Sequence, residues 1–251
     1  MQYFALPSTA TETAAAAFLS KNDPALRSIV FSSLDQLREG DLTTPPVLSW
    51  AELELYRARV SSPARIRSVF PILLDRHQAL KVRTMCVSSD LHGNPTPPLL
   101  QMAHLAFDAI NLALMAHALL LTFKEIELRT EHFQLHNAAT EAFWDPKTAT
   151  YTDSNAIPWL LLARIATPER ALLLFPENAF SVPSPLPPLD DCLALLKGLD
   201  AFCFRKQTAA FSEQLRSFLQ SPDSVAERSR FPYSAAVILQ HAPTSTGASP
   251  A

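Results

Sequence analysis

Two histidines stand four residues apart in the segment His132-Phe-Gln-Leu-His136. On a helix this spacing places both imidazoles on one face, where they can bind the same metal ion. Glutamate does not follow His132, so the HExxH pattern of the zinc proteases is absent. The alternative is two partly exposed histidines beside a hydrophobic face. A metal site would need a third ligand, for which the candidates are His104, His117, Asp108 and Glu141.

His104 is followed four residues later by Asp108. This HxxxD spacing is similar to that of the CoA-dependent acyltransferases, where the resemblance implies a histidine that acts as general base. In that family a glycine follows the aspartate and a second motif rich in Gly and Trp lies downstream, whereas here Ala109 follows and no second motif is present. We therefore expect a buried His–Asp pair joined by an i,i+4 hydrogen bond inside an apolar helix.

The segment 57–83 is strongly basic, with seven cationic residues against Asp75 alone, a net charge of +6 in a chain of net charge −3. Arginine binds phosphate and carboxylate groups in a bidentate manner, so this basic belt predicts contact with RNA or with an acidic protein surface. Pairing inside the protein, or a solvated face, is the alternative, because no aromatic platform for bases accompanies the belt. The belt consists of Arg57, Arg59, Arg65, Arg67, Arg76, Lys81 and Arg83.

The composition of the 251 residues and the motifs that they lack exclude several classes of protein. Only 4 glycines stand against 21 prolines, so the glycine-rich loops that bind nucleotides are absent. No GxSxG or Ser-x-x-Lys pattern supplies a nucleophile, and the 3 cysteines form no CxxC pair. The N-terminus lacks the features of a secretory signal. We expect an intracellular protein, cytoplasmic or nuclear, with no cofactor and no small-molecule substrate, and the patterns favour a protein without enzymatic activity.

Prolines and capping residues predict where helices begin. Proline is favoured at the first helical position, and in four places it follows a residue whose side chain can cap the helix. Two further starts are predicted by capping boxes, at Thr9-Ala-Thr-Glu12 and Ser49-Trp-Ala-Glu52. The four proline starts are Asp23-Pro24, Ser62-Pro63, Thr167-Pro168 and Ser221-Pro222.

The segment 99–123 is apolar on nearly every side and long enough to cross a bilayer. It also contains polar residues that are costly in a membrane, namely Gln101, His104, Asp108, Asn111 and His117. We therefore expect the central core helix of the fold and no membrane span. Because no Pro or Gly interrupts residues 99–144, we expect the chain to turn between Thr122 and Thr130, since one helix would be too long for a domain.

Evidence for strands is scattered over 2–6, 81–87 and 235–239, which predicts at most a minor β element. The stretch Phe143-Trp-Asp-Pro-Lys-Thr-Ala-Thr-Tyr151-Thr-Asp153 resembles a hairpin of helical-toroid glycosidases and sugar epimerases, over about eleven residues. Those enzymes have roughly twice this length, and they carry glycine where Ala149 stands. The resemblance implies an architecture of helical hairpins.

The predicted fold is all-α: a helical bundle, or stacked helical hairpins of the α-solenoid or tetratricopeptide kind, with eight to ten helices. We expect a main helical domain over 1–180, a Pro-rich connector at 181–188, a C-terminal helical subdomain over 189–241 and a disordered tail at 242–251. The predicted function is a non-catalytic scaffold or interaction subunit that binds other protein subunits. The alternatives are an RNA- or acidic-partner-binding adaptor that uses the basic belt, and a metal-dependent helical enzyme that uses His132 and His136.

Overall fold

The protein is all-α, as predicted, in a computed structural model that describes residues 10–39, 47–86, 99–176 and 188–240. The described residues form twelve α-helices, more than the eight to ten expected, with two short 3₁₀ turns at Ser154–Ala156 and Pro222–Ser224. The helices are α1 (Ala10–Ser20), α2 (Pro24–Glu39), α3 (Leu48–Arg57), α4 (Pro63–Cys86), α5 (Leu99–Ala118), α6 (Thr122–Phe143), α7 (Ile157–Leu162), α8 (Pro168–Leu174), α9 (Leu189–Ala201), α10 (Arg205–Gln220), α11 (Val225–Arg230) and α12 (Pro232–Gln240).

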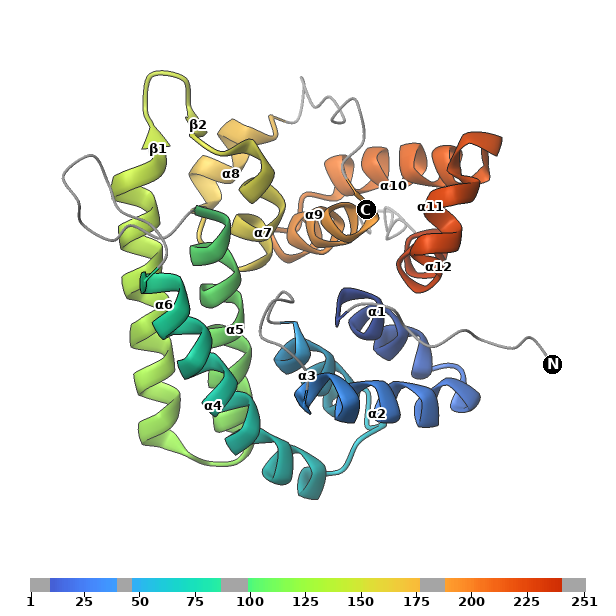
Figure 1. Ribbon diagram of the computed structural model, residues 1–251. Coiled ribbons are helices and arrows are strands. Elements are labelled where there is room, and N and C mark those ends of the chain that lie inside the picture. Colours follow the sequence, from blue (N-terminus) through green and yellow to red (C-terminus); the bar gives the residue numbers. More distant parts are fainter. Residues whose placement is uncertain (1–9, 40–46, 87–98, 177–187, 241–251) are drawn as a thin grey trace, which may run out of the picture.

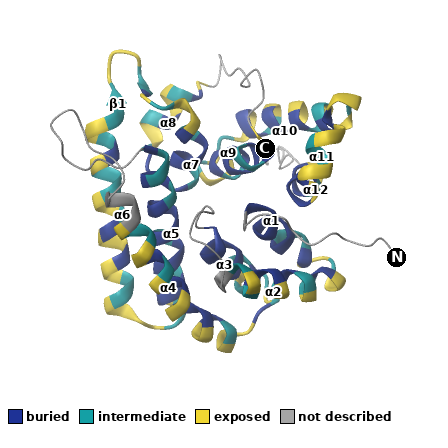
Figure 2. Ribbon diagram, viewed as in Figure 1, coloured by how far each residue is buried: buried dark blue, intermediate teal, exposed yellow. Residues whose placement is uncertain are grey.

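The helices form a closed ring with an inner and an outer layer (Figure 1). Six inner helices pack side by side in the order α1, α3, α5, α7, α9, α12, and α12 packs on α1 to close the ring. The outer helices α2, α4, α6, α10 and α11 each pack against an inner helix, and α8 packs against the small hairpin described below. Figure 2 shows how the two layers differ in burial: the inner helices are mostly buried, whereas α6 and α10 each have one exposed side.

Helix α5 is the central core helix that the sequence predicts. Thirteen of its twenty residues are buried, so a helix long and apolar enough for a membrane lies largely inside this fold. The turn after it comes earlier than expected, at Leu119–Leu121, just before the predicted window that starts at Thr122.

The minor β element lies at none of the three segments expected as strands. The stretch that resembles a toroid hairpin forms a two-stranded antiparallel sheet, with β1 (Trp144–Asp145) paired to β2 (Thr150–Tyr151). The expected strands are wrong where the structure describes them, because 81–86 belongs to α4 and 235–239 to α12, each packed as part of a helix. Residues 2–6, most of the connector 181–188 and the tail 242–251 lie outside the described residues, and the division into two domains stays a prediction.

Four helices end in the same way, with one residue in the left-handed conformation that usually belongs to glycine. The two backbone hydrogen bonds of a Schellman motif close α3, α5, α7 and α9, for example Ile165 N to Leu160 O at 2.8 Å and Arg164 N to Leu161 O at 2.9 Å. A side chain in this conformation costs about 1–2 kcal/mol. The four left-handed residues are Arg59 (φ 57°), Leu120 (φ 60°), Arg164 (φ 56°) and Cys203 (φ 58°).

Candidate functional site

A buried charge network joins four helices at the side of the ring where α4 and α6 cover α5. His77 of α4 lies between two carboxylates, with Nδ1 at 2.9 Å from Asp108 Oδ2 and Nε2 at 3.2 Å from Glu131 Oε1. Ser49 of α3 donates to the other oxygen of Asp108, and Lys81 Nζ lies 3.1 Å from Glu131 Oε2. Every member except Lys81 is buried, so the network lies inside the protein rather than at an open site.

Burial alone would lower the pKa of His77, but the hydrogen bonds and charges of Asp108 and Glu131 outweigh it and raise the pKa to about 9. The same imidazolium, with Lys81, lowers the pKa of Glu131 against the opposing effect of burial. At neutral pH the network therefore holds a charged histidine between carboxylates. The burial of His77 could have been predicted from the sequence, because His77 continues the buried stripe of Ile66, Phe70 and Leu73 at helical spacing.

Two predictions at this network are wrong. Asp108 bonds His77 and Ser49, and the expected i,i+4 partner His104 instead packs its ring edge-on against Trp159, at 4.5 Å between ring centroids. The capping box at Ser49 and Glu52 does not form, because the N-cap of α3 is Val47, two residues before Ser49, and Glu52 binds Arg65. Ion pairs between helices compete with local capping for the same side chains, and here they prevail.

The basic belt is partly paired inside the protein. Arg65 binds Glu52 at 2.6 Å and Asp35 at 3.1 Å, and its guanidinium lies over the ring of Phe31. Lys81 binds Glu131, and Arg57 binds Glu54 at 2.8 Å within α3. Other members behave differently: Arg59 and Arg67 are exposed, Arg76 is half-buried and has a partner of its own, and the side chain of Arg83 lies outside the described residues. Of the belt residues whose side chains are described, Arg57, Arg65 and Lys81 therefore hold carboxylates of the protein, and Arg59 and Arg67 are exposed to solvent.

His132 and His136 lie on one side of α6, as the spacing requires, but each has a different neighbour. His132 Nε2 donates to the carbonyl of Ala163 at 2.7 Å, and burial lowers its pKa, with smaller contributions from the charges of His136, Arg129 and Arg164. His136 Nδ1 lies 3.2 Å from Asn137 Oδ1, and its ring is parallel to that of Phe133. Within the described ranges no three His, Cys, Asp or Glu side chains come together as a metal site.

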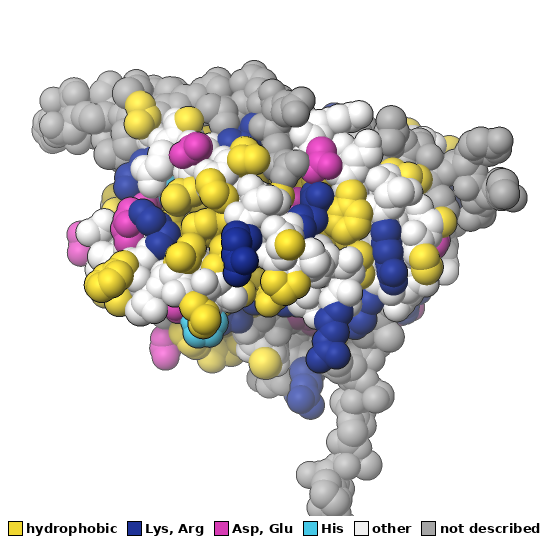
Figure 3. Space-filling model, turned by 90° about the horizontal axis from the view of Figure 1, so that it is seen from below, with side chains coloured by type: hydrophobic (Ala, Val, Ile, Leu, Met, Phe, Trp, Pro, Cys, Tyr) yellow, Lys and Arg dark blue, Asp and Glu magenta, His cyan; other side chains and the backbone are white. Residues whose placement is uncertain are grey.

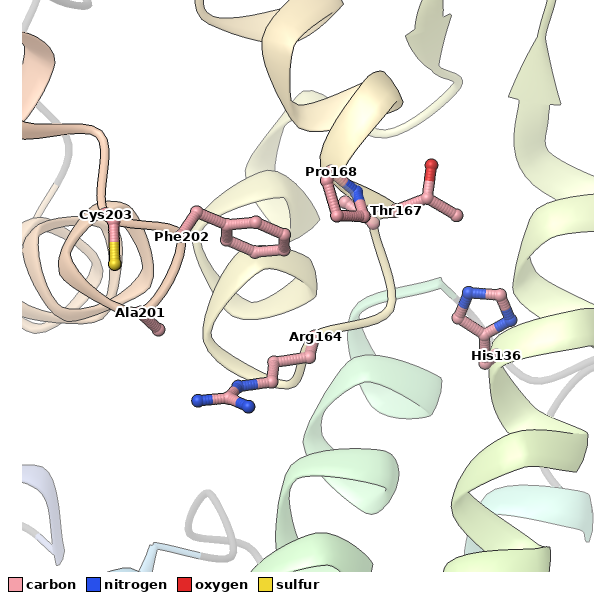
Figure 4. Close-up of a pocket in the computed structure, with 8 residues that line it drawn as sticks. His136, Arg164, Thr167, Pro168, Ala201, Phe202 and Cys203 are labelled. Carbon is pink, nitrogen blue, oxygen red and sulfur yellow. The ribbon is translucent and has the colours of Figure 1, made fainter.

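His136 lines a pocket of about 420 Å³ between α6, the α7–α8 connection and the end of α9 (Figure 4). In this view the guanidinium of Arg164 extends toward the end of α9, the ring of Phe202 points toward Pro168, and His136 faces them from α6. Both left-handed residues of this region, Arg164 and Cys203, are among its lining residues. The lining is completed by Ala166, Thr167, Pro168 and Ala201.

A second polar cluster lies at the N-terminal ends of the inner helices. Glu12 of α1 accepts from the backbone N–H groups of Tyr233 and Ser234 in α12, both at 2.8 Å. Burial, followed by the charge of Glu12, raises the pKa of Asp190 in α9 to about 6. On the neighbouring helices, Trp159 Nε1 donates to Asp191 Oδ1 at 2.8 Å, and burial lowers the pKa of His104 to about 4. This cluster links α1, α12, α9, α7 and α5. The expected box at the start of α1 lies partly outside the described residues, because Thr9 precedes them, and the carboxylate of Glu12 binds α12.

Exposed apolar side chains gather around the start of α6. Phe123 is 91% exposed, Leu120 87%, Phe133 61% and Ile126 56%. On α6 the three positions 123, 126 and 133 lie on one face, opposite the buried Leu128 and Ala139. Seen from the side of the α5–α6 turn, the surface shows hydrophobic groups with Lys and Arg side chains between them (Figure 3). We call Leu120, Leu121, Phe123, Ile126 and Phe133 the α6 patch.

These features define a class of all-α proteins: a two-layered ring of short helices with a small hairpin. One solved structure with this fold is an uncharacterized conserved protein from Thermus thermophilus, with a TM-score of 0.65 and 16% sequence identity over 91% of each chain. At that identity the likeness shows the fold alone. No protein-family model matches the chain, and no curated protein matches it either.

Proposed function

We propose that the protein is a non-catalytic helical subunit that binds another protein through the α6 patch. The observation that supports this function is the exposure of large apolar side chains on the outer face of a helix that already has a buried inner face. Exposed patches of this kind mark sites of protein interaction in soluble proteins. Five large side chains lie within residues 120–133, and two of them are aromatic.

The partner chemistry follows from the shape and charge of the patch. A single helix face with apolar side chains at 123, 126 and 133 pairs best with an amphipathic helix of the partner, by side-chain packing between the two helices. The polar neighbours of the patch carry both signs, with Lys124 paired to Glu127 at 2.5 Å and Arg129 paired to Glu125 at 2.8 Å. Since these charges are already neutralised within α6, burial of apolar area would provide most of the binding energy.

The network at His77 lies inside the protein, where its carboxylates are bound to His77, Ser49 and Lys81. The enzymatic alternative rested on His132 and His136, which have different neighbours, and among the described residues no third His, Cys, Asp or Glu joins them as a metal site. The adaptor alternative has fewer free cations in the basic belt, since Arg65 and Lys81 hold carboxylates of the protein itself, while Arg59 and Arg67 stay exposed. The interaction subunit therefore remains the best-supported function.

The test is affinity purification from native extract with a variant that removes the α6 patch. We expect the triple variant Phe123→Ser, Ile126→Ser, Phe133→Ser to lose the stoichiometric partner that the parent protein retains. The matched control is Leu172→Ser, Leu173→Ser, which removes exposed apolar side chains of α8 (50% and 58% exposed) outside the patch. Circular dichroism must show equal helix content in all three proteins.

A photo-crosslinking amino acid at position 126 then identifies the bound segment by mass spectrometry. The proposal predicts crosslinks to a helical segment of another protein. A parent protein that elutes from native extract as a lone monomer would contradict the proposed function, as would a triple variant that retains the partner. Crosslinks between two copies of this chain would also contradict binding to another protein, and would show that the α6 patch mediates self-association.

A further inference from the structure

The pocket of Figure 4 is bordered by two helix ends that keep side chains where glycine is the easiest residue. Arg164 ends α7 and Cys203 ends α9, both in the left-handed conformation. A glycine at either position would adopt this conformation without the steric conflict between Cβ and the backbone. The two helix ends therefore place a guanidinium and a thiol at the pocket, in the same backbone conformation as Arg59 and Leu120 at the ends of α3 and α5.

The lining of the pocket is suited to an anion. Its eight residues include Arg164 and His136 but no aspartate or glutamate. Arg164 ends α7 beside these residues and is exposed, so its guanidinium is accessible to an anion from solvent. A guanidinium binds phosphate or carboxylate through two parallel hydrogen bonds.

The remaining walls are suited to an organic body. Phe202 presents its ring toward Pro168, and Ala166 and Ala201 add apolar surface (Figure 4). A volume of about 420 Å³ falls in the usual range for sites of small molecules, roughly 300–1,000 Å³. A single inorganic anion would leave the aromatic wall without a contact.

We propose that this pocket binds a small organic anion, with a phosphate or carboxylate group on Arg164 and an apolar body against Phe202 and Pro168. The site adjoins the α6 patch, because the ring of Phe133 lies parallel to that of His136, but it does not require the partner proposed above. Thr167 accepts from Arg170 N at 3.3 Å to cap α8, which leaves its O–H able to donate to a bound anion, whereas Arg164 supplies the charge that recognises it.

The experiment is isothermal titration calorimetry at low ionic strength and neutral pH with phenyl phosphate, benzoate, inorganic phosphate and benzyl alcohol as probes. We expect saturable one-to-one binding of phenyl phosphate or benzoate, and binding at least about tenfold weaker for inorganic phosphate and for the neutral alcohol. The variant Arg164→Gly should lose at least about tenfold in affinity for the organic anion, although it should resist urea better than the parent because the strain is relieved.

The matched control is Arg59→Gly, the same substitution at the same position of the Schellman motif that ends α3. Arg59 does not line the pocket, so this variant loses one positive charge and one strained side chain but should bind as the parent does. Arg164→Gln serves as the second variant if Arg164→Gly does not fold. Absence of saturable binding of both organic anions would overturn the proposal. So would equal affinity for benzyl alcohol or inorganic phosphate, unchanged affinity in the Arg164 variant, or an equal loss in Arg59→Gly.

Discussion

At the scale of single residues, His77 is the side chain with the most unusual surroundings. It is 1% exposed and lies between Asp108 and Glu131, which belong to the two helices that α4 helps to hold together. A buried charge is expensive unless it is paired and hydrogen-bonded, and both ring nitrogens of His77 have carboxylate partners. Loss of the proton would leave two carboxylates close together without the cation between them.

The stability of the protein should therefore decrease between pH 6.5 and about 9. The pKa of His77 is raised in the folded protein to about 9 from an ordinary value of 6.5, so its stabilising contribution is complete below 6.5 and is lost as the pH rises through the folded value. The loss in the free energy of unfolding is at most about 3 kcal/mol. Urea titrations at several pH values measure it, and His77→Gln should flatten the slope in this window. An unchanged slope in that variant would refute the assignment.

At the scale of helices, sequence patterns predicted the first residues of the helices better than the hydrogen-bond partners of their side chains. Three of the four proline starts are α-helix starts with the expected cap, for example Asp23 Oδ1 accepting from Ala25 N at 2.9 Å. The fourth, Ser221-Pro222, begins a 3₁₀ turn without a side-chain cap. Local chemistry determines such starts, so they can be predicted from a few neighbouring residues. Ser49 and Glu52 were misassigned because their partners Asp108 and Arg65 come from other helices, which no local pattern reveals.

Helices α7 and α9 cross at Gly198, where the two backbones come unusually close. A Cβ at this position would lie 2.7 Å from Leu161 Cβ and 3.1 Å from Leu162 N. By helix propensity alone, replacing glycine with alanine in a helix interior would stabilise the protein by about 1 kcal/mol. Here the clash with a neighbouring Cβ and backbone prevails, so we expect Gly198→Ala to destabilise the protein by about 1–3 kcal/mol. Urea denaturation measures the change, and a variant as stable as the parent would show that the helices can separate freely.

At the scale of the whole molecule, the ring is closed by helices from opposite ends of the chain. Glu12 of α1, which is fully buried, binds two N–H groups at the start of α12, more than 220 positions later. The all-α class was predictable because helical periodicity is local, whereas closure depends on contacts between distant segments. The candidate sites show the same limit, since the pocket unites α6, the α7–α8 connection, α8 and α9, and among its lining residues only His136 was a candidate site residue from the sequence.

Closure should depend on the carboxylate of Glu12. Glu12→Gln offers one oxygen and one NH₂ group to two N–H donors, so we expect a loss of about 1–3 kcal/mol in the free energy of unfolding. Hydrogen exchange should accelerate in α12 and α1 ahead of the other helices. The control Glu169→Gln changes an exposed acid in the first turn of α8 and should remain within about 0.5 kcal/mol of the parent. Uniform acceleration over all helices in Glu12→Gln would argue against a local role in closure.

The pairing of α1 with α12 also has a consequence for biosynthesis. Helix α1 carries four successive buried alanines, Ala14 to Ala17, whose neighbours include a helix that leaves the ribosome more than 200 residues later. At about 5–20 residues per second, α1 waits at least about ten seconds for that neighbour. During synthesis the first helix of the ring therefore remains without this neighbour, and the ring closes only once α12 has been made.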